Sequence, residues 1–156
     1  MGKLLSLENV DMFKYAEKCL YEYKRNLAAL EILRQELQVE RSSTDVHGQN
    51  YKDALSFTGT PSNPVLNRLM RIEKLEERIR QLEHYTEPVT RLIADLKAPY
   101  VREGSQKAEL HSIMELYYFG QNSVAIILSE LHISRQSMFR HRRTLVKTLM
   151  GYMGCV

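Results

Sequence analysis

Two long stretches of the chain repeat apolar residues in alternating steps of three and four, and the first covers residues 9–40. Its apolar positions are Phe13, Ala16, Leu20, Tyr23, Leu27, Leu30 and Leu37, with Arg34 as the one polar interruption. This spacing is a heptad repeat, and neither glycine nor proline interrupts it. The pattern therefore predicts a long N-terminal helix that occupies residues 1–40.

The second heptad stretch predicts another long helix over residues 63–98. Its apolar positions are Ile72, Leu75, Ile79, Leu82, Val89, Ile93 and Leu96, and Thr86 fills the remaining position of the repeat. Pro88 stands inside this pattern and lacks a backbone donor, so we expect the helix to kink or restart there. Thr86 is a residue of the type that caps a restarted helix.

The segment between the two repeats, residues 41–62, is rich in Ser, Thr, Gly, Asn and Pro, which is typical of a loop or linker. Neither heptad helix can bury its apolar stripe alone. One interpretation is that the two helices pack antiparallel as a helical hairpin, as ordinary amphipathic helices of one bundle. The other is that they form a coiled-coil homodimer with a second chain.

The third part of the chain, residues 105–156, reads as short helices separated by turns. "KAELHSIMELYYF" places Leu110, Ile113, Met114 and Tyr117 on one helical face, and "GQNS" ends it. "SVAIILSEL" has apolar residues at Val124, Ile127, Leu128 and Leu131. The tight turn "HIS" then precedes a basic helix. This arrangement predicts a C-terminal helix-turn-helix DNA-binding domain and an all-α fold for the chain.

Charge is distributed unevenly along the 156 residues, although the formal net charge is only +3. Residues 1–130 carry 17 Lys and Arg against all 19 Asp and Glu, whereas residues 131–156 carry five cations and no carboxylate side chain. A local excess of this kind indicates a segment that binds a polyanion.

A helical wheel of the basic helix separates its apolar residues from its cations. Met138, Leu145 and Leu149 form one stripe, and Ser134 is suited to cap the first turn. The opposite face carries Arg135, Gln136, Phe139, Arg140, Arg143 and Lys147. Arg142 falls at the edge of the apolar stripe, where its stem is suited to cover the core. We therefore do not assign Arg142 to DNA.

A recognition helix needs this division, because one face packs on the protein while the other enters a groove lined with phosphates. Two other interpretations stay open. The first is that this segment is a solvated surface helix without a ligand, although such helices usually mix charges of both signs. A cationic face would also bind RNA or an acidic protein.

The stretch "ELYYFGQNSVAIILSELHISRQSMFRHRRTLVKTL" resembles the sigma-70 region 4 type of helix-turn-helix. The chain as a whole is similar to the ArpU/RinA type of phage late-operon transcriptional regulators, through "SFTGTPSNPVLNRLMRIEKLEERI" and "LHISRQSMFRHRRTL". The resemblance covers roughly residues 55–150 and implies that DNA is contacted by Arg135, Gln136, Ser137, Phe139, Arg140 and Arg143. The chain departs from the pattern at Leu128, His132 and His141, which stand where a small residue, a glycine and an apolar residue are usual.

The sequence lacks the common nucleotide-binding, metalloprotease, serine-hydrolase and CxxC motifs, and its five histidines lack ligand spacing. We therefore expect no enzymatic activity, no metal and no cofactor. Two unpatterned cysteines, no signal peptide and no long apolar run predict a protein of the reducing cytoplasm of a bacterial host, with no membrane span.

The sequence favours a DNA-binding transcriptional activator of phage late genes, with double-stranded DNA and host RNA polymerase as expected partners. The first alternative is a small terminase subunit, an oligomeric adaptor that recognises viral DNA for packaging. The second is a structural coiled-coil protein whose basic tail is incidental. Oligomeric state distinguishes the first two, because a monomer or dimer favours the regulator and a large ring favours the terminase.

Overall fold

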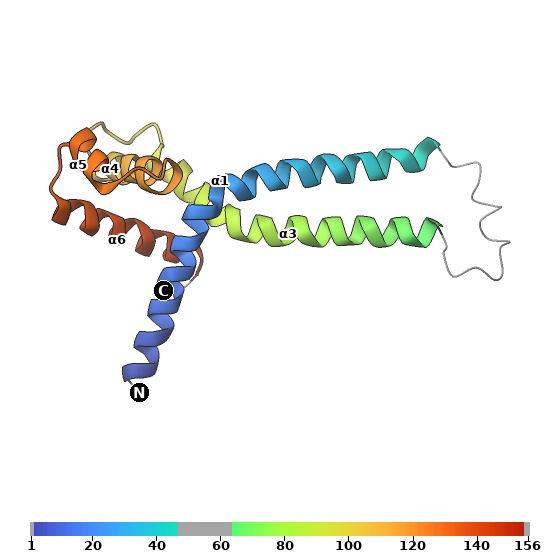
Figure 1. Cartoon of the computed structure of the whole chain (residues 1–156), viewed down its shortest axis with the longest axis horizontal. Helices are drawn as coiled ribbons and strands as arrows, with labels where there is room; N and C mark the ends of the chain where they lie inside the picture. Colours follow the sequence, from blue (N-terminus) through green and yellow to red (C-terminus); the bar gives the residue numbers. More distant parts are fainter. Residues whose placement is uncertain (1, 47–63, 155–156) are drawn as a thin grey trace. The chain divides into compact units, whose positions relative to one another are not determined.

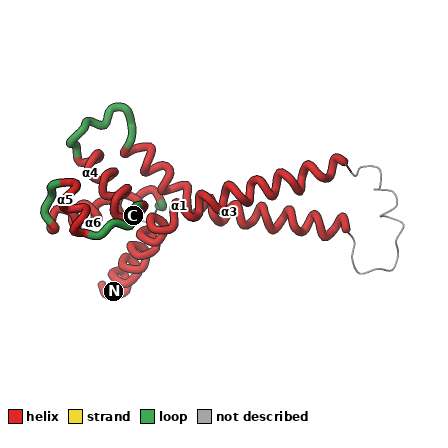
Figure 2. Tube along the Cα trace, turned by 45° about the horizontal axis from the view of Figure 1, so that its top comes forward, coloured by secondary structure: helices red, strands yellow, loops and turns green. Residues whose placement is uncertain are grey.

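A computed structural model of the chain describes residues 2–46 and 64–154, with side chains placed for residues 10–43 and 64–154. All regular secondary structure in the described residues is helical, and the helices and their connecting loops are shown in Figures 1 and 2. The elements are α1 (Gly2–Val46), α3 (Pro64–Leu96), α4 (Gln106–Ile113), the π-helix η1 (Met114–Phe119), α5 (Val124–Leu131) and α6 (Arg135–Tyr152). The predicted all-α class is therefore confirmed. No described helix combines the length and apolar character that crossing a membrane requires.

The predicted end of the first helix and the predicted restart of the second helix at Pro88 were wrong. Helix α1 continues to Val46, so residues 41–46 are helical and not part of a loop; the predicted loop over 47–62 lies outside the described residues. Helix α3 is unbroken across Pro88, so Thr86 does not cap a new helix and is 3% exposed inside α3. Pro88 removes one hydrogen bond, but Val89 and Leu92 beside it are fully buried, and this packing holds the helix together.

The chain divides into two compact units. Unit 1 contains the described residues up to Arg25 and from Tyr85 onward, and unit 2 contains the described residues between Asn26 and His84. Helices α1 and α3 each contribute one part to each unit.

Unit 1 is built around a single apolar core that receives side chains from four segments of the chain. The buried residues are Ala16, Cys19, Leu20 and Tyr23 of α1, Val89, Leu92 and Leu96 of α3, Leu110, Met114 and Tyr118 of α4 and η1, and Leu145, Val146 and Leu149 of α6. The C-terminal helices thus share their core with the start of α1 and the end of α3. The domain predicted from residue 105 onward is larger than the sequence indicated.

The π-helix η1 explains one misplaced core residue. Its wider turn is closed by a hydrogen bond from the Gly120 amide to the Glu115 carbonyl at 2.8 Å, five residues back. The extra residue per turn shifts the buried face by one position, so Tyr118 is fully buried where α-helical spacing predicted Tyr117. A Cβ at Gly120 would lie 2.6 Å from Asn122 Nδ2 and 3.1 Å from the Glu115 and Leu116 carbonyl oxygens, so a larger residue there would displace the Asn122 amide.

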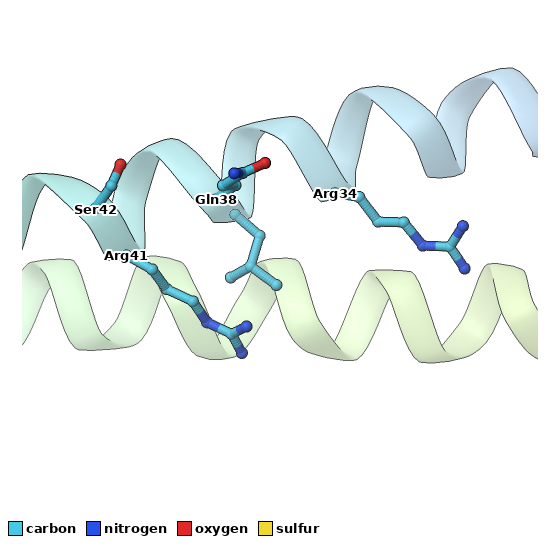
Figure 3. A pocket seen from close by; sticks show the side chains of 5 residues that line it. Arg34, Gln38, Arg41 and Ser42 are labelled. Atoms are coloured by element: carbon cyan, nitrogen blue, oxygen red, sulfur yellow. The ribbon is translucent and has the colours of Figure 1, made fainter.

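Unit 2 is an antiparallel helical hairpin whose own apolar residues meet inside it. Leu30, Leu37 and Ile79 are buried, with Leu33, Ile72, Leu75 and Leu82 packed around them. Two ion pairs show that the helices run antiparallel: Arg34 pairs with Glu83 at 2.9 Å, and the later α1 residue Arg41 pairs with the earlier α3 residue Glu76 at 2.5 Å. Figure 3 shows both guanidinium groups extending from α1 toward α3.

The heptad stripe of α1 departs from the prediction at one position. Ala16, Leu20, Tyr23, Leu30 and Leu37 are buried as predicted, but Leu27 is 36% exposed and its neighbour Asn26 is buried. The physical reason is a change of neighbours: in unit 1 this helix packs against several segments, and in unit 2 only against α3. The second chain considered for the heptad stripe is therefore not needed to bury it.

Candidate nucleic-acid interface

A capped turn fixes where α6 begins. Ser134 has an extended backbone (φ −75°, ψ 155°), and its Oγ accepts a hydrogen bond from the Ser137 amide at 3.1 Å. This satisfies one of the amides that every helix leaves without a partner in its first turn. The cap predicted for Ser134 is confirmed, and Arg135 and Gln136 become the first exposed residues of the helix.

The turn between α5 and α6 uses a left-handed residue. His132 has φ 52° and ψ 41°, a conformation that costs a residue other than glycine roughly 1–2 kcal/mol. The strain expected for a histidine at this position is therefore present. Ser123 caps α5 by accepting a hydrogen bond from the Ile126 amide at 3.4 Å, so both short helices have defined starts.

One face of α6 is held in the core of unit 1. Met138, Leu145, Val146 and Leu149 are all fully buried, which confirms the apolar stripe of the helical wheel and adds Val146 to it. Burial on this face fixes the rotation of the helix about its own axis. The remaining residues of α6 are therefore presented in a defined direction.

Four polar residues form an exposed row along α6, which we call the basic row. They are Gln136, Arg140, Arg143 and Lys147, and each is exposed. Their spacing of four, three and four residues keeps them on one side of the helix over a length of about 16 Å. Arg135, also exposed, stands at the start of the same helix.

Four of the five cations of this helix lack carboxylate partners in the part of the chain that the structure describes. Within the described residues, Arg135, Arg140, Arg143 and Lys147 take part in none of the ion pairs, whereas Arg34, Arg41 and Arg91 elsewhere each bind a glutamate. Arg140 reaches only the Ser137 hydroxyl, at 3.4 Å. These four charges are therefore exposed and uncompensated at close range.

Ser137 and Phe139, which the resemblance assigned to DNA, are only half-buried and have partners within the protein. Ser137 Oγ accepts a hydrogen bond from Ser134 Oγ at 3.0 Å as well as the contact from Arg140. The Phe139 ring lies 5.7 Å from the Arg135 guanidinium and 5.9 Å from that of Arg142. Ser137 therefore contacts Arg140 of the basic row, whereas Phe139 contacts two cations that lie outside it.

Arg142 is the exception among the cations of α6. Its Nε donates to Glu17 Oε1 at 2.8 Å and to Tyr118 Oη at 3.2 Å, and its Nη2 also contacts Glu17. Tyr118 Oη in turn donates to Glu17 Oε1 at 2.7 Å. Burial, with the hydrogen bond to Glu17, raises the pKa of Tyr118 and keeps its hydroxyl protonated. This geometry is consistent with the expectation that Arg142 does not contact DNA.

Sequence reasoning missed Glu17, because 125 residues separate it from Arg142. The sequence contained only an indirect indication of this pair. Arg142 is a cation at the edge of an apolar stripe, and no acidic residue lies near it in the sequence, so its partner has to come from another segment. His141, which stands where an apolar residue is usual, lies similarly 3.1 Å from Glu109 of α4.

The described residues contain no cluster of His, Cys, Asp and Glu able to hold a metal ion. Comparison of the chain with protein-family models, curated proteins and solved structures found no match.

Proposed function

We propose that the chain is a sequence-specific, double-stranded-DNA-binding transcriptional regulator in which α5, the turn at His132 and α6 act as a helix-turn-helix. The observation that carries this proposal is the basic row. Arg140, Arg143 and Lys147 are exposed and form no ion pair with any other described residue, and they lie on a helix whose other face is fully buried.

The dimensions and charge of α6 suit the major groove. A helix with its side chains is about 10–12 Å across, and the groove of B-DNA is about 12 Å wide. Gln136 lies in the first turn, where recognition helices read base edges, and its amide suits the paired donor and acceptor of adenine. Arg143 and Lys147 lie further along, where contacts to phosphates are expected.

Activation of phage late genes, with contact to host RNA polymerase in the host cytoplasm, is the more specific form of the proposal. It is supported by the resemblance of residues 55–150 to the ArpU/RinA type of regulators. Nuclease-protection mapping tests it: a protected site within a late promoter supports the activator. A protected site at a packaging sequence, bound by a large ring of subunits, supports the terminase alternative.

The DNA-binding claim is tested by removing charge from the basic row. In fluorescence anisotropy with duplex DNA, we expect the double substitution Arg140→Gln and Arg143→Gln in the full chain to weaken binding at least about tenfold. Arg91→Gln is the matched control, because Arg91 is an exposed arginine of unit 1 that already pairs with Glu87 at 2.5 Å. Equal affinity for both proteins would exclude the basic row as the contact surface.

A further inference from the structure

A groove runs along one face of the unit 2 hairpin, between α1 and α3. It encloses about 600 Å³ and is lined by both helices. On its α1 edge stand Ile32 and Val39, which are 57% and 65% exposed. They are seven residues apart, so they project on nearly the same side of α1 about 10 Å from each other. Two large apolar side chains at heptad spacing beside a groove are typical of a helix that packs on another helix.

The two edges of this groove carry opposite charges. On the α1 edge, Glu36 lies between the two apolar residues, and on the α3 edge stand Arg71, Lys74 and Arg78. None of these four takes part in an ion pair within the described residues. Three ion pairs join the two helices of the hairpin. Arg34–Glu83 and Arg41–Glu76 involve no residue that lines the groove, whereas Glu40 on its α1 edge pairs with Arg68 of α3 at 3.6 Å. The groove face therefore keeps Glu36 and three cations that no ion pair of the described residues neutralises.

We propose that this groove face binds the same face of a second copy of the chain, forming a four-helix bundle. The twofold axis runs parallel to the helices, so that α1 of each copy covers α3 of the other. A rotation about this axis leaves the position of each residue along the length of the bundle unchanged. Glu36 of one copy then faces the Lys74–Arg78 region of the other, and Ile32 and Val39 enter its groove.

The matching lengths and charges favour a second copy over an unrelated partner. The apolar pair spans seven residues of α1, and the basic set from Arg71 to Arg78 also spans seven residues of α3. One face thus carries both an acidic, apolar edge and a basic edge of equal length. A twofold dimer sets the acidic, apolar edge of each copy against the basic edge of the other at once, whereas a foreign helix would have to supply both complements.

This dimer surface is distinct from the heptad stripe, which is buried inside the hairpin at Leu30, Leu37 and Ile79. The proposal goes beyond DNA binding and does not depend on it. If both hold, each particle carries two copies of the basic row. Such a particle would recognise DNA through two half-sites related by a twofold axis.

Sedimentation equilibrium of the full chain over a range of protein concentrations tests the proposal. We expect a monomer–dimer equilibrium for the wild-type protein. Glu36→Lys and Arg78→Glu should each raise the dimer dissociation constant at least about tenfold, because each places like charges opposite one another. The double variant carrying both substitutions should recover an affinity within about threefold of the wild-type value, because the charges are then complementary again.

Glu73→Lys is the matched control, because Glu73 is an exposed glutamate two residues from Arg71 and so lies on the far side of α3. It should leave the dissociation constant unchanged. Far-UV circular dichroism and thermal melts of every variant separate loss of association from loss of folding, and Ile32→Ser provides a second, uncharged disruption. A wild-type protein that stays monomeric overturns the proposal. So does a folded double variant that fails to recover association, or an effect of Glu73→Lys equal to that of Glu36→Lys.

Discussion

Glu17 of α1 and Arg142 of α6 are joined by a hydrogen bond of 2.8 Å across 125 residues of sequence. Tyr118 of η1 bonds to both, so three segments of unit 1 meet at one partly buried polar cluster. Arg142 projects from the same side of α6 as the buried Val146 and Leu149, away from the basic row. The cluster fixes the rotation of α6 against α1 and removes Arg142 from the charges available to a ligand.

Replacing Glu17 tests this role. Glu17→Gln leaves the Arg142 guanidinium with 24% of its side chain exposed and without a carboxylate, so we expect the free energy of unfolding to fall by about 1–3 kcal/mol. In a chain of this size that corresponds to a melting temperature lower by about 2–10 °C, measured by circular dichroism.

Glu22→Gln is the control for that measurement. Glu22 pairs with Arg25, whose side chain is 74% exposed, and exposed pairs contribute little to stability. We expect a change below about 0.5 kcal/mol. If the two substitutions lowered the melting temperature equally, the cluster would not anchor α6.

The buried face of α6 gives a second prediction. Leu145→Ala removes a fully buried side chain from the core of unit 1 and should destabilise the protein by about 2–4 kcal/mol. Ile126→Ala is the comparison, because Ile126 of α5 is 49% exposed and should tolerate truncation with a loss below about 1 kcal/mol. Chemical denaturation of both variants measures the difference, and similar midpoints would mean that α6 is rotated relative to the structure.

The hairpin of unit 2 gives a third prediction. Ile79 is 8% exposed between Leu30 and Leu37, so Ile79→Glu places a charge among apolar side chains. We expect lower helical content and a lower melting temperature, with a loss of at least about 2 kcal/mol. Gln38→Glu adds the same charge at an exposed position of α1 and should change neither quantity. An unaffected Ile79→Glu protein would contradict the hairpin.

Much of this architecture follows from local spacing. The heptad steps predict α1 and α3, and the i, i+3, i+4 spacing predicts the buried stripe of α6, because side-chain direction in a helix depends only on position. The continuity of α3 across Pro88 could not be predicted, because it depends on how strongly Val89 and Leu92 pack against distant segments. The π-turn at Met114–Phe119 likewise adds one residue to a pattern that looks α-helical.

The candidate interface could be predicted in part for the same reason. Ser134, the exposed cations and the separate position of Arg142 follow from the sequence of α6 alone. The partners of Arg142 and His141 lie in α1 and α4, and no local rule connects them. The half-buried state of Phe139 also depends on tertiary packing, because the Arg142 guanidinium that lies 5.9 Å from its ring is bound by Glu17 of α1.

Specificity provides a fourth prediction. Gln136→Ala should cost about 1–3 kcal/mol on a selected binding site and little on a scrambled duplex at the same salt concentration. Lys147→Ala should weaken binding to both duplexes by a similar amount, because phosphates carry no sequence information. If Gln136→Ala weakened both equally, α6 would be a general polyanion-binding surface and not a recognition helix.

The salt dependence of binding tests the central claim most directly. Four cations of α6 lack carboxylate partners within the described residues, and releasing counterions from four phosphates gives a slope of log affinity against log salt of about −3 to −4 per bound chain. We therefore predict that slope for the wild-type protein on duplex DNA, and a slope about two units shallower after Arg140→Gln and Arg143→Gln. A flat salt dependence, or a slope that these two substitutions leave unchanged, would contradict binding of DNA by the exposed face of α6.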